Sequence, residues 1–496
     1  MIRSFLPAAV AALLCSSCMI GPKYQKPAAI TPPALKELAG NDQWKMATPS
    51  DQILKGNWWE IFGDAQLNRL EELVKVNNQN VKQAEAIYRQ ARAFVVLDHA
   101  GYYPVIGSTP SITQTDAGTN GGRGGGTNQS FSLGGTAAWE PDLWGRVRLS
   151  VENSTDIAQS DAALIQNVLL AQQALLATDY FALAANDMQQ AVLKESIAAY
   201  QTNLQLATDR FRFGLASRSD ITLAQAQLAG AQAQATDLRV LRSQLEHAIA
   251  TLTGQSPASL DIAAAQIAAP PPPIPVAIPS VLLERRPDVA ASERQVAAAN
   301  ANVGLAQTAF YPTLTLSASL GFLSNNLANL FTYASRTWSA GPSISQTLFD
   351  FGRRGAQLQV TEAAYDATVA TYRQTVLLAF QEVEDDLSTL HHLSEEAVIQ
   401  DQAVKAAQES LALELERYKA GTDSYINVIT TQTIALSDQL TAVTILQRRM
   451  AAAVDLVKAV GGGWDNSNLP STDYIRAVSA NEKPQYPAGT PVNPFK

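Results

Sequence analysis

The chain has 496 residues, of which 46% are hydrophobic and 16% are charged, and its formal net charge is −9. The negative balance gives nucleic-acid binding no electrostatic support, and the lack of apolar runs of about 18 or more residues beyond the N-terminus argues against a helical membrane protein. The length suits two ordinary domains or one large elongated domain.

Residues 1–17 have the pattern of a bacterial signal peptide with a lipobox. A basic start precedes an apolar stretch that ends at Cys15 and is too short to span a membrane stably. Small residues precede Cys18, which predicts cleavage after Ser17 and lipidation of Cys18 by acyl chains such as palmitate. An ordinary secretory signal with incidental cysteines is the alternative. With lipidation at Cys18, residues 18–60 form a lipidated N-terminal extension, and the mature chain keeps no cysteine for a disulfide.

A tandem repeat with an offset of 207 or 208 residues organises the rest of the chain. The Tyr-Tyr-Pro at 102–104 matches the Phe-Tyr-Pro at 310–312, and Gly254 matches Gly461 at the ends of the two units. Because one register holds over many blocks, we predict two structural repeats. They lie at 61–268 and 286–463, joined by a stiff proline-rich linker at 269–285 and followed by a polar, poorly ordered C-terminal tail at 464–496.

Repeat 1 begins with an amphipathic helix that ends at 102–104, because proline cannot continue a helix. Two strands follow at about 104–117 and 128–141, separated by a glycine-rich polar loop. A proline-free stretch from Arg146 to Phe213 then predicts a helix about 100 Å long. Its apolar residues recur at alternating spacings of four and three, the pattern of a coiled-coil seam, at Leu193, Ile197, Tyr200, Leu204, Ala207 and Phe211.

Each long helix is predicted to turn back sharply. Gly214 suits a left-handed helix cap, and the chain returns as a helix from Ile221 to about Leu252. Each repeat therefore contains a long helical hairpin, and the two tips are expected at 214–220 and 421–427.

In repeat 2 the strand alternation is clearest. Apolar side chains from Leu314 to Phe322 alternate with Thr, Ser and Gly, and a weaker alternation runs from Trp338 to Leu348. Such a sheet has one apolar face and open edges, whose backbone amides cannot stay unpaired in lipid. Bacterial outer-membrane barrels need at least about eight strands to close. Four strands per chain therefore force oligomerisation, and three copies would form a 12-stranded barrel continued by the hairpins.

Several local motifs occur in the order and spacing of one family. They are Cys18 with Pro22-Lys23-Tyr24, Trp58-Trp59 with Phe62-Gly63-Asp64, the run from Trp139 to Arg146, and the run from Ile274 to Asp288. Over about residues 18–465 the chain resembles the TolC/OprM-like outer-membrane efflux factors, specifically their lipoprotein (NodT-type) branch. The resemblance implies an α+β membrane fold, namely a lipid-anchored homotrimer with a 12-stranded β-barrel in the bacterial outer membrane and a long α-helical barrel across the periplasm.

The resemblance also implies a function and partners. The channel would passively conduct small molecules delivered by a periplasmic adaptor and an inner-membrane pump, the pump being of the resistance-nodulation-division type. One alternative is the outer-membrane duct of a type I-like secretion system. Another is a trimeric coiled-coil scaffold lipoprotein without a pore, against which the strand alternation argues.

The hairpin tips are the predicted adaptor contacts, at matching positions of the two repeats. They are Arg210, Phe211, Gly214 and Ser217 in repeat 1, and Arg417, Tyr418, Gly421 and Ser424 in repeat 2. In the plainer interpretation the glycines only cap helices and the arginines are solvated, and for the glycines both interpretations can hold.

In the family a gate closes the periplasmic end just after the second tip, with an acidic ring and an apolar ring. The corresponding positions are Ile426, Asn427 and Thr430. Ile426 suits the apolar ring, whereas Asn427 and Thr430 carry no charge. Asp220 or Asp423 would then supply the acidic ring, and we expect the gate where the two tips differ.

Aromatic residues gather at the predicted strand ends. They belong either to a membrane-interface girdle or to packing at the junction between barrel and helices. The residues are Tyr102, Tyr103, Trp139, Trp144, Phe310, Tyr311, Phe349 and Phe351.

The sequence carries no catalytic or cofactor signature. The four histidines, including His99 and His247, show no metal-ligand spacing, and His391-His392 near Glu395 is expected on a solvated helix face. The glycine run at 121–126 lacks the Lys-Ser/Thr of a phosphate loop, and no nucleophile elbow occurs. We therefore predict that the protein is not an enzyme and holds no cofactor or metal.

Overall fold

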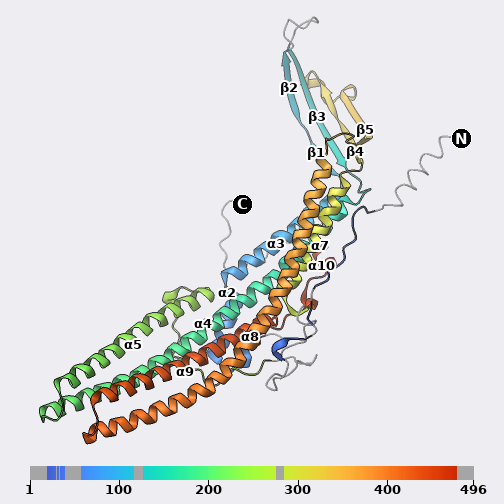
Figure 1. The fold of residues 1–496 in the computed structure, drawn as a ribbon. Helices are drawn as coiled ribbons and strands as arrows, with labels where there is room; N and C mark the ends of the chain where they lie inside the picture. Colours follow the sequence, from blue (N-terminus) through green and yellow to red (C-terminus); the bar gives the residue numbers. More distant parts are fainter. Residues whose placement is uncertain are drawn as a thin grey trace.

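The computed structural model describes residues 19–29, 31–32, 34–38, 57–116, 127–274 and 284–477. The molecule is long and narrow, with a β-sheet at one end and two helical hairpin tips at the other (Figure 1). The lipobox with Cys18, the glycine-rich loop, much of the proline-rich linker and the end of the tail lie outside the described residues.

The helices repeat with the offset seen in the sequence. In repeat 1 they are α2 (Ala65–Asn77), α3 (Gln79–His99), α4 (Arg146–Arg212) and α5 (Arg218–Leu252). In repeat 2 they are α7 (Pro287–Thr308), α8 (Arg353–Ala420) and α9 (Tyr425–Ala459). The shorter elements are η2 (Lys36–Leu38), η4 (Trp58–Phe62), η5 (Ala100–Tyr102), η7 (Pro257–Ser259), η8 (Leu327–Asn329), η9 (Tyr333–Ser335), η10 (Asn466–Asn468) and α10 (Thr472–Arg476).

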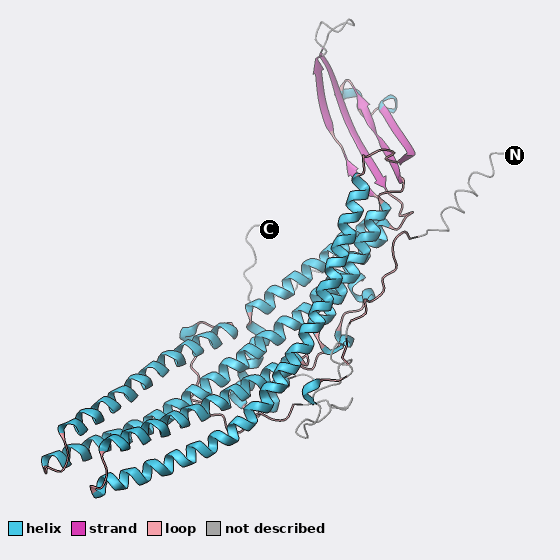
Figure 2. Cartoon of the chain, viewed as in Figure 1, coloured by secondary structure: helices cyan, strands magenta, loops and turns pink. Residues whose placement is uncertain are grey.

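The two arms of each hairpin differ in length. α4 has 67 residues and α8 has 68, about 100 Å each, because no proline interrupts them. The returning helices α5 and α9 have 35 residues each, about 50 Å. The expected length of about 100 Å is therefore correct for one arm only. The remainder of the long helices packs against α3 and α7 toward the sheet (Figure 2).

The coiled-coil seam of α4 packs largely as predicted. Leu193 and Tyr200 are buried in a cluster with Ala231 of α5, and Ala207 is buried as well. Phe211, the last predicted member of the seam, is exposed in the final turn of α4. By length and composition alone α4 could cross a membrane, yet 56% of its most apolar window is buried inside the molecule.

The main hydrophobic core lies where η4 and α2 pack against α4, α8 and α9. Trp58 and Trp59 are buried there with their rings edge to face, 5.9 Å apart between centroids. Asp64 starts α2 as its N-cap, because its carboxylate accepts the amide hydrogens of the first turn. The same carboxylate accepts the hydroxyl of Tyr180 on α4 at 2.6 Å, which ties the cap to the long helix.

The sheet is antiparallel throughout and contains strands from both repeats. Its elements are β1 (Val105–Ser108), β2 (Ser111–Asp116), β3 (Thr127–Trp139), β4 (Thr313–Ser324) and β5 (Arg336–Ser345). β1 and β2 both pair with β3 in one continuous register, broken at Pro110, which has no amide hydrogen to donate. They therefore occupy a single strand position, and the sheet has the four positions that the sequence predicts.

The last strand ends earlier than predicted. β5 stops at Ser345, which pairs with Thr313, the first residue of β4. Pro312 precedes Thr313, so β4 offers no partner beyond this point, and Leu348 lies outside the strand. The length of β5 is thus set by its neighbour and not by its own alternation.

The two faces of the sheet differ in chemistry, as the alternation predicts. Leu320 pairs with Trp338 on one face, and both side chains are exposed in the single chain. On the opposite face Ser319 lies beside Ser339, with their hydroxyl oxygens 2.8 Å apart. Among the described strands, neither β5 nor the β1–β2 position is paired on its outer edge, so the single chain leaves both edges open.

The C-terminal tail is ordered over its first part, contrary to the expectation for 464–496. Ile475 of α10 is fully buried and packs against Val95 of α3 and Val151 of α4. The side-chain amide of Gln159 donates to the carbonyl of Pro470 at 3.0 Å. A single buried isoleucine in a polar segment gives too weak a periodic signal to reveal this docking from sequence.

Candidate functional site at the helical tips

Each tip is a tight turn built around a left-handed glycine. Gly214 has φ +74° and Gly421 has φ +79°, which confirms the predicted caps. The returning helices begin sooner than expected, at Arg218 and Tyr425. Four of the gate candidates therefore lie in helices and not in the loops, with Asp220 in the first turn of α5, Ile426 and Asn427 in the first turn of α9, and Thr430 in its second turn.

Arg210 joins the two tips. Its guanidinium donates to the carbonyl oxygens of Tyr418 and Lys419 at 2.7 and 2.9 Å, and lies 4.7 Å from the centroid of the Tyr418 ring. Those carbonyls belong to the last turn of α8, which carries partial negative charge, and the Tyr418 carbonyl also accepts the amide hydrogen of Gly421 at 3.0 Å. Arg210 is therefore a cap supplied by repeat 1 to the long helix of repeat 2.

Two buried tyrosines pack close to the contact between Arg210 and α8. Tyr418 and Tyr425 are buried with ring centroids 5.0 Å apart, packed with Ala224 and Val428. Burial raises the pKa of Tyr425 to about 12, and burial followed by the nearby charge of Asp220 raises the pKa of Tyr418. Both phenols therefore stay protonated, and Tyr418, predicted to face an adaptor, is instead a packing residue within the chain.

Arg417, the counterpart of Arg210, behaves differently. Its guanidinium pairs with Glu414 on the same helix at 2.8 Å, and 62% of its side chain is exposed. Among its described interactions, the Arg417 guanidinium makes no contact with the other hairpin. Two equivalent arginines thus have unequal environments in one chain.

The acidic candidates are held by local hydrogen bonds. Asp423 accepts the amide hydrogen of Ser424 and the side-chain amide of Asn427, each at 2.6 Å, and these bonds lower the pKa of Asp423. Asp220 accepts the hydroxyl of Ser217 at 2.8 Å, and the same hydroxyl caps α5. Asp423 is therefore kept ionised next to the amide of Asn427, a pairing that the sequence reasoning did not foresee.

The most exposed apolar side chains of the first tip were not among the predicted contacts. Phe213 is 80% exposed and Leu215 is 67% exposed, on either side of Gly214. Phe211 in the last turn of α4 and Ile426 at the start of α9 are exposed to a lesser degree. The signal was present in the sequence, since large apolar residues in a loop around a glycine are unusual unless a partner covers them.

The aromatic residues at the strand ends divide into two groups. Trp144 donates its indole N–H to the carbonyl of Pro312 at 2.7 Å and packs on Tyr311 with centroids 5.1 Å apart, so it fastens the junction. Phe349 and Phe351 are fully exposed in the single chain. Packing therefore accounts for Trp144 and Tyr311, and the interface girdle stays a prediction for Phe349 and Phe351.

The described part of the N-terminal segment, residues 19–29, 31–32 and 34–38, runs from the sheet end toward the middle of the molecule (Figure 1). At its start the amide of Ile20 donates to the carbonyl of Trp144 at 3.1 Å. At its end the amide of Lys36 donates to the carboxylate of Glu384 on α8 at 2.6 Å. The residue following Cys18 in the sequence is thereby held at the junction between sheet and helices.

An amphipathic sheet with open edges, continued by paired helical hairpins, defines a class of outer-membrane channel proteins. The profile of the family described as "Outer membrane efflux protein" matches residues 70–255 and 278–462. The chain belongs to this outer membrane efflux protein family.

Two relatives illustrate the similarity in sequence. The probable efflux pump outer membrane protein TtgC of Pseudomonas putida is 29% identical over 472 residues, covering 94% of this chain and 96% of the relative. The pyoverdine export outer membrane protein OpmQ of Pseudomonas aeruginosa is 30% identical over 450 residues, covering 86% and 92%.

Solved structures share the fold. The outer-membrane channel OprN superposes with a TM-score of 0.82 at 29% identity, covering 90% of this chain and 100% of OprN. The CmeC outer membrane channel of Campylobacter jejuni superposes with a TM-score of 0.85 at 22% identity, covering 92% and 97%. The CmeC likeness shows the fold alone, since its identity is low.

Proposed function

We propose that three copies of this outer-membrane efflux protein assemble into one channel. It passively conducts small molecules from the periplasmic side across the outer membrane, with a periplasmic adaptor and an inner-membrane pump of resistance-nodulation-division type as partners. The observation that carries the proposal is the sheet, which has four strand positions, one apolar face and two open edges. The names of TtgC and OpmQ favour small-molecule export over a type I-like secretion duct.

The open edges support closure by other copies. In lipid, every edge amide needs a partner, and a closed barrel is the way that strands provide it. Four positions per chain reach the roughly eight-strand minimum only with further copies, and three copies give a 12-stranded barrel. In that barrel the serine and threonine face would line the pore, and the leucine and tryptophan face would meet lipid. We also infer that the chain has no catalytic role.

The unequal arginines support a ring of alternating hairpins. Arg210 caps the end of α8 within the chain, whereas Arg417 reaches no second hairpin in its described contacts. By the repeat offset, the acceptors equivalent to Tyr418 and Lys419 are the carbonyls of Phe211 and Arg212 at the end of α4. In a closed ring, Arg417 would cap α4 of the next copy and repeat the contact already made by Arg210.

The N-terminal segment supports a lipid anchor at Cys18 and membership of the lipoprotein (NodT-type) branch. Met19 lies against Gly145, directly below the sheet. Met19 directly follows Cys18 in the sequence, so acyl chains on Cys18 would be attached next to a residue held at the junction between sheet and helices. Further along, the amide of Lys36 donates to the carboxylate of Glu384 on α8.

The anchor can be tested by exchanging its attachment atom. We expect the wild-type mature chain to begin at Cys18 and to carry acyl chains in intact-mass spectrometry, and Cys18→Ser to lack that added mass. Cys15→Ser, which lies inside the predicted signal peptide, is the matched control and should be acylated like the wild type. A wild-type mature chain of unmodified mass would refute the anchor.

The exposed tip residues are proposed to contact the adaptor, and the first turns of α5 and α9 to form the closed gate. Phe211, Ser217, Arg417 and Ser424 remain accessible in the chain, together with Phe213 and Leu215. Ile426 is the candidate for an apolar ring. Asp220 and Asp423 are the candidates for acidic charge, and Asn427 and Thr430 flank them.

Removing the acidic groups should change ion selectivity. In planar bilayers we expect Asp220→Asn and Asp423→Asn to lower the cation-to-anion permeability ratio, because each removes three negative charges from a trimeric constriction. Asp209→Asn is the control and should leave the ratio unchanged, because Asp209 is an exposed carboxylate in the last turn of α4 that already pairs with Arg212. If both test variants keep the wild-type ratio, neither aspartate belongs to the gate.

A further inference from the structure

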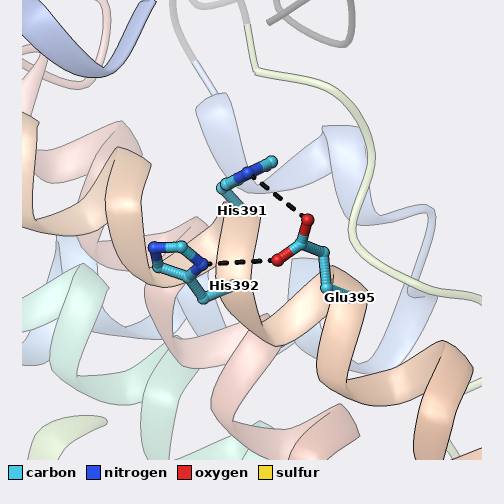
Figure 3. Close-up of side chains that lie close together, drawn as sticks. All are labelled: His391, His392 and Glu395. Atoms are coloured by element: carbon cyan, nitrogen blue, oxygen red, sulfur yellow. Dashed lines mark hydrogen bonds and ion pairs between the residues drawn. The ribbon is translucent and has the colours of Figure 1, made fainter.

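Two imidazoles and a carboxylate converge on one side of α8, near its middle. His391 and His392 both approach the carboxylate of Glu395, which lies one turn further along the helix (Figure 3). Leu390 and Leu393 beside them are buried in the interior. The backbone that carries the three groups is therefore fixed, while the groups themselves remain accessible to solvent.

The distances suit a metal ion. His391 Nε2 lies 3.7 Å from Glu395 Oε1, and His392 Nδ1 lies 3.4 Å from Glu395 Oε2. The three ligand atoms all lie within 4.8 Å of one another. Bonds of about 2.0–2.2 Å in tetrahedral zinc sites separate ligand atoms by about 3.4 Å. Small side-chain rotations would therefore bring all three donors onto one ion.

We propose that His391, His392 and Glu395 bind a divalent transition-metal ion of the zinc class, with water completing the coordination. Two imidazole nitrogens and one carboxylate select such ions over magnesium and calcium, because those two ions prefer to be coordinated by oxygen atoms only. The side chains are 34%, 69% and 60% exposed, so the site is open to solvent. This assignment goes beyond the channel function and does not rest on it.

The neighbouring carboxylate is excluded from the site. Glu396 follows Glu395 in the sequence but points to Arg448 of α9, with 3.6 Å between the charged atoms. The carboxylate of Glu396 therefore forms an ion pair with the guanidinium of Arg448 and is not a ligand in the proposed site. The i, i+1, i+4 spacing of the three donors is not a standard metal signature, which explains why the sequence alone indicated only a solvated face.

Zinc titration of the purified full chain, in detergent and without a histidine tag, tests the site. Isothermal titration calorimetry is expected to show one Zn²⁺ bound per chain. His391→Ala, His392→Ala and Glu395→Gln should each weaken binding at least about tenfold, since even outer-shell changes cost that much. His247→Ala, an exposed histidine of α5, and Glu396→Gln should bind as the wild type does.

A spectroscopic readout separates ligation from a general effect of charge. Cu²⁺ bound to the wild type is expected to show electron paramagnetic resonance splitting from two imidazole nitrogens, and each single histidine variant should show splitting from one. Absence of stoichiometric binding to the wild type would overturn the proposal. Wild-type affinity in any one of the three ligand variants would also overturn the three-ligand site.

Discussion

Replacing Gly461 with alanine is expected to destabilise the full chain by more than about 3 kcal/mol. Gly461 has φ +94°, a region that L side chains rarely adopt. An added Cβ would lie 2.0 Å from the carbonyl oxygen of Arg285 and 2.8 Å from its carbonyl carbon. Both obstacles are backbone atoms, so no side-chain rotation can relieve the overlap.

The backbone around this contact cannot easily move. The guanidinium of Arg286, next to Arg285, donates to the carbonyl of Ala459 at 2.9 Å and pairs with Glu382 on α8 at 2.8 Å. The start of α7 is thus held by contacts with the middle of α8 and the end of α9. Gly254 has the equivalent place in repeat 1, where a Cβ would lie 2.5 Å from the carbonyl oxygen of Asn77.

Thermal unfolding followed by circular dichroism measures the effect. Gly230→Ala is the matched control, because Gly230 lies inside α5 with nothing within 4 Å of an added Cβ. That change should stabilise the helix by about 0.5–1 kcal/mol. If Gly461→Ala melts together with the wild type, the close packing of the repeat junction is not as described here.

Replacing Arg210 with alanine is expected to favour the open form of the proposed channel. The substitution removes two charged hydrogen bonds to the end of α8 and the contact with the Tyr418 ring. At a partly exposed site this loss is worth about 2 kcal/mol. It corresponds to a shift of roughly 30-fold in the balance between closed and open tips.

Single-channel recording in planar bilayers measures this shift as open probability. Arg212→Ala is the control, because Arg212 is exposed and pairs only weakly with Asp209 at 3.4 Å. Arg210→Lys should fall between the wild type and alanine, since an ammonium cannot span both carbonyls in the guanidinium geometry. Equal open probabilities for Arg210→Ala and Arg212→Ala would show that the contact does not hold the tips.

Much of the fold could be predicted because its signals are local. The lack of proline between Arg146 and Phe213 marks the long helix, and Gly214 marks its end. The alternation from Leu314 to Phe322 reveals both the strand and its two faces. Spacing, proline and glycine act within a few residues, so a single sequence carries them fully.

The features missed by sequence reasoning depend on distant partners. Arg210 and Tyr418 are 208 residues apart, and nothing near either of them indicates the contact. The end of β5 depends on where β4 begins. The docking of Ile475 depends on a surface formed by α3 and α4. The tandem repeat gave equivalent positions, yet it could not show that equivalent arginines have different partners.

The central claim is that copies of this chain close a conducting pore, and planar-bilayer recording of the purified full chain tests it most directly. The predicted result is discrete unitary currents, with higher open probability for Arg210→Ala than for the wild type. The contradicting result is the absence of current from both proteins at all voltages, in samples whose helical content is native by circular dichroism. That result would identify the chain as a non-conducting scaffold.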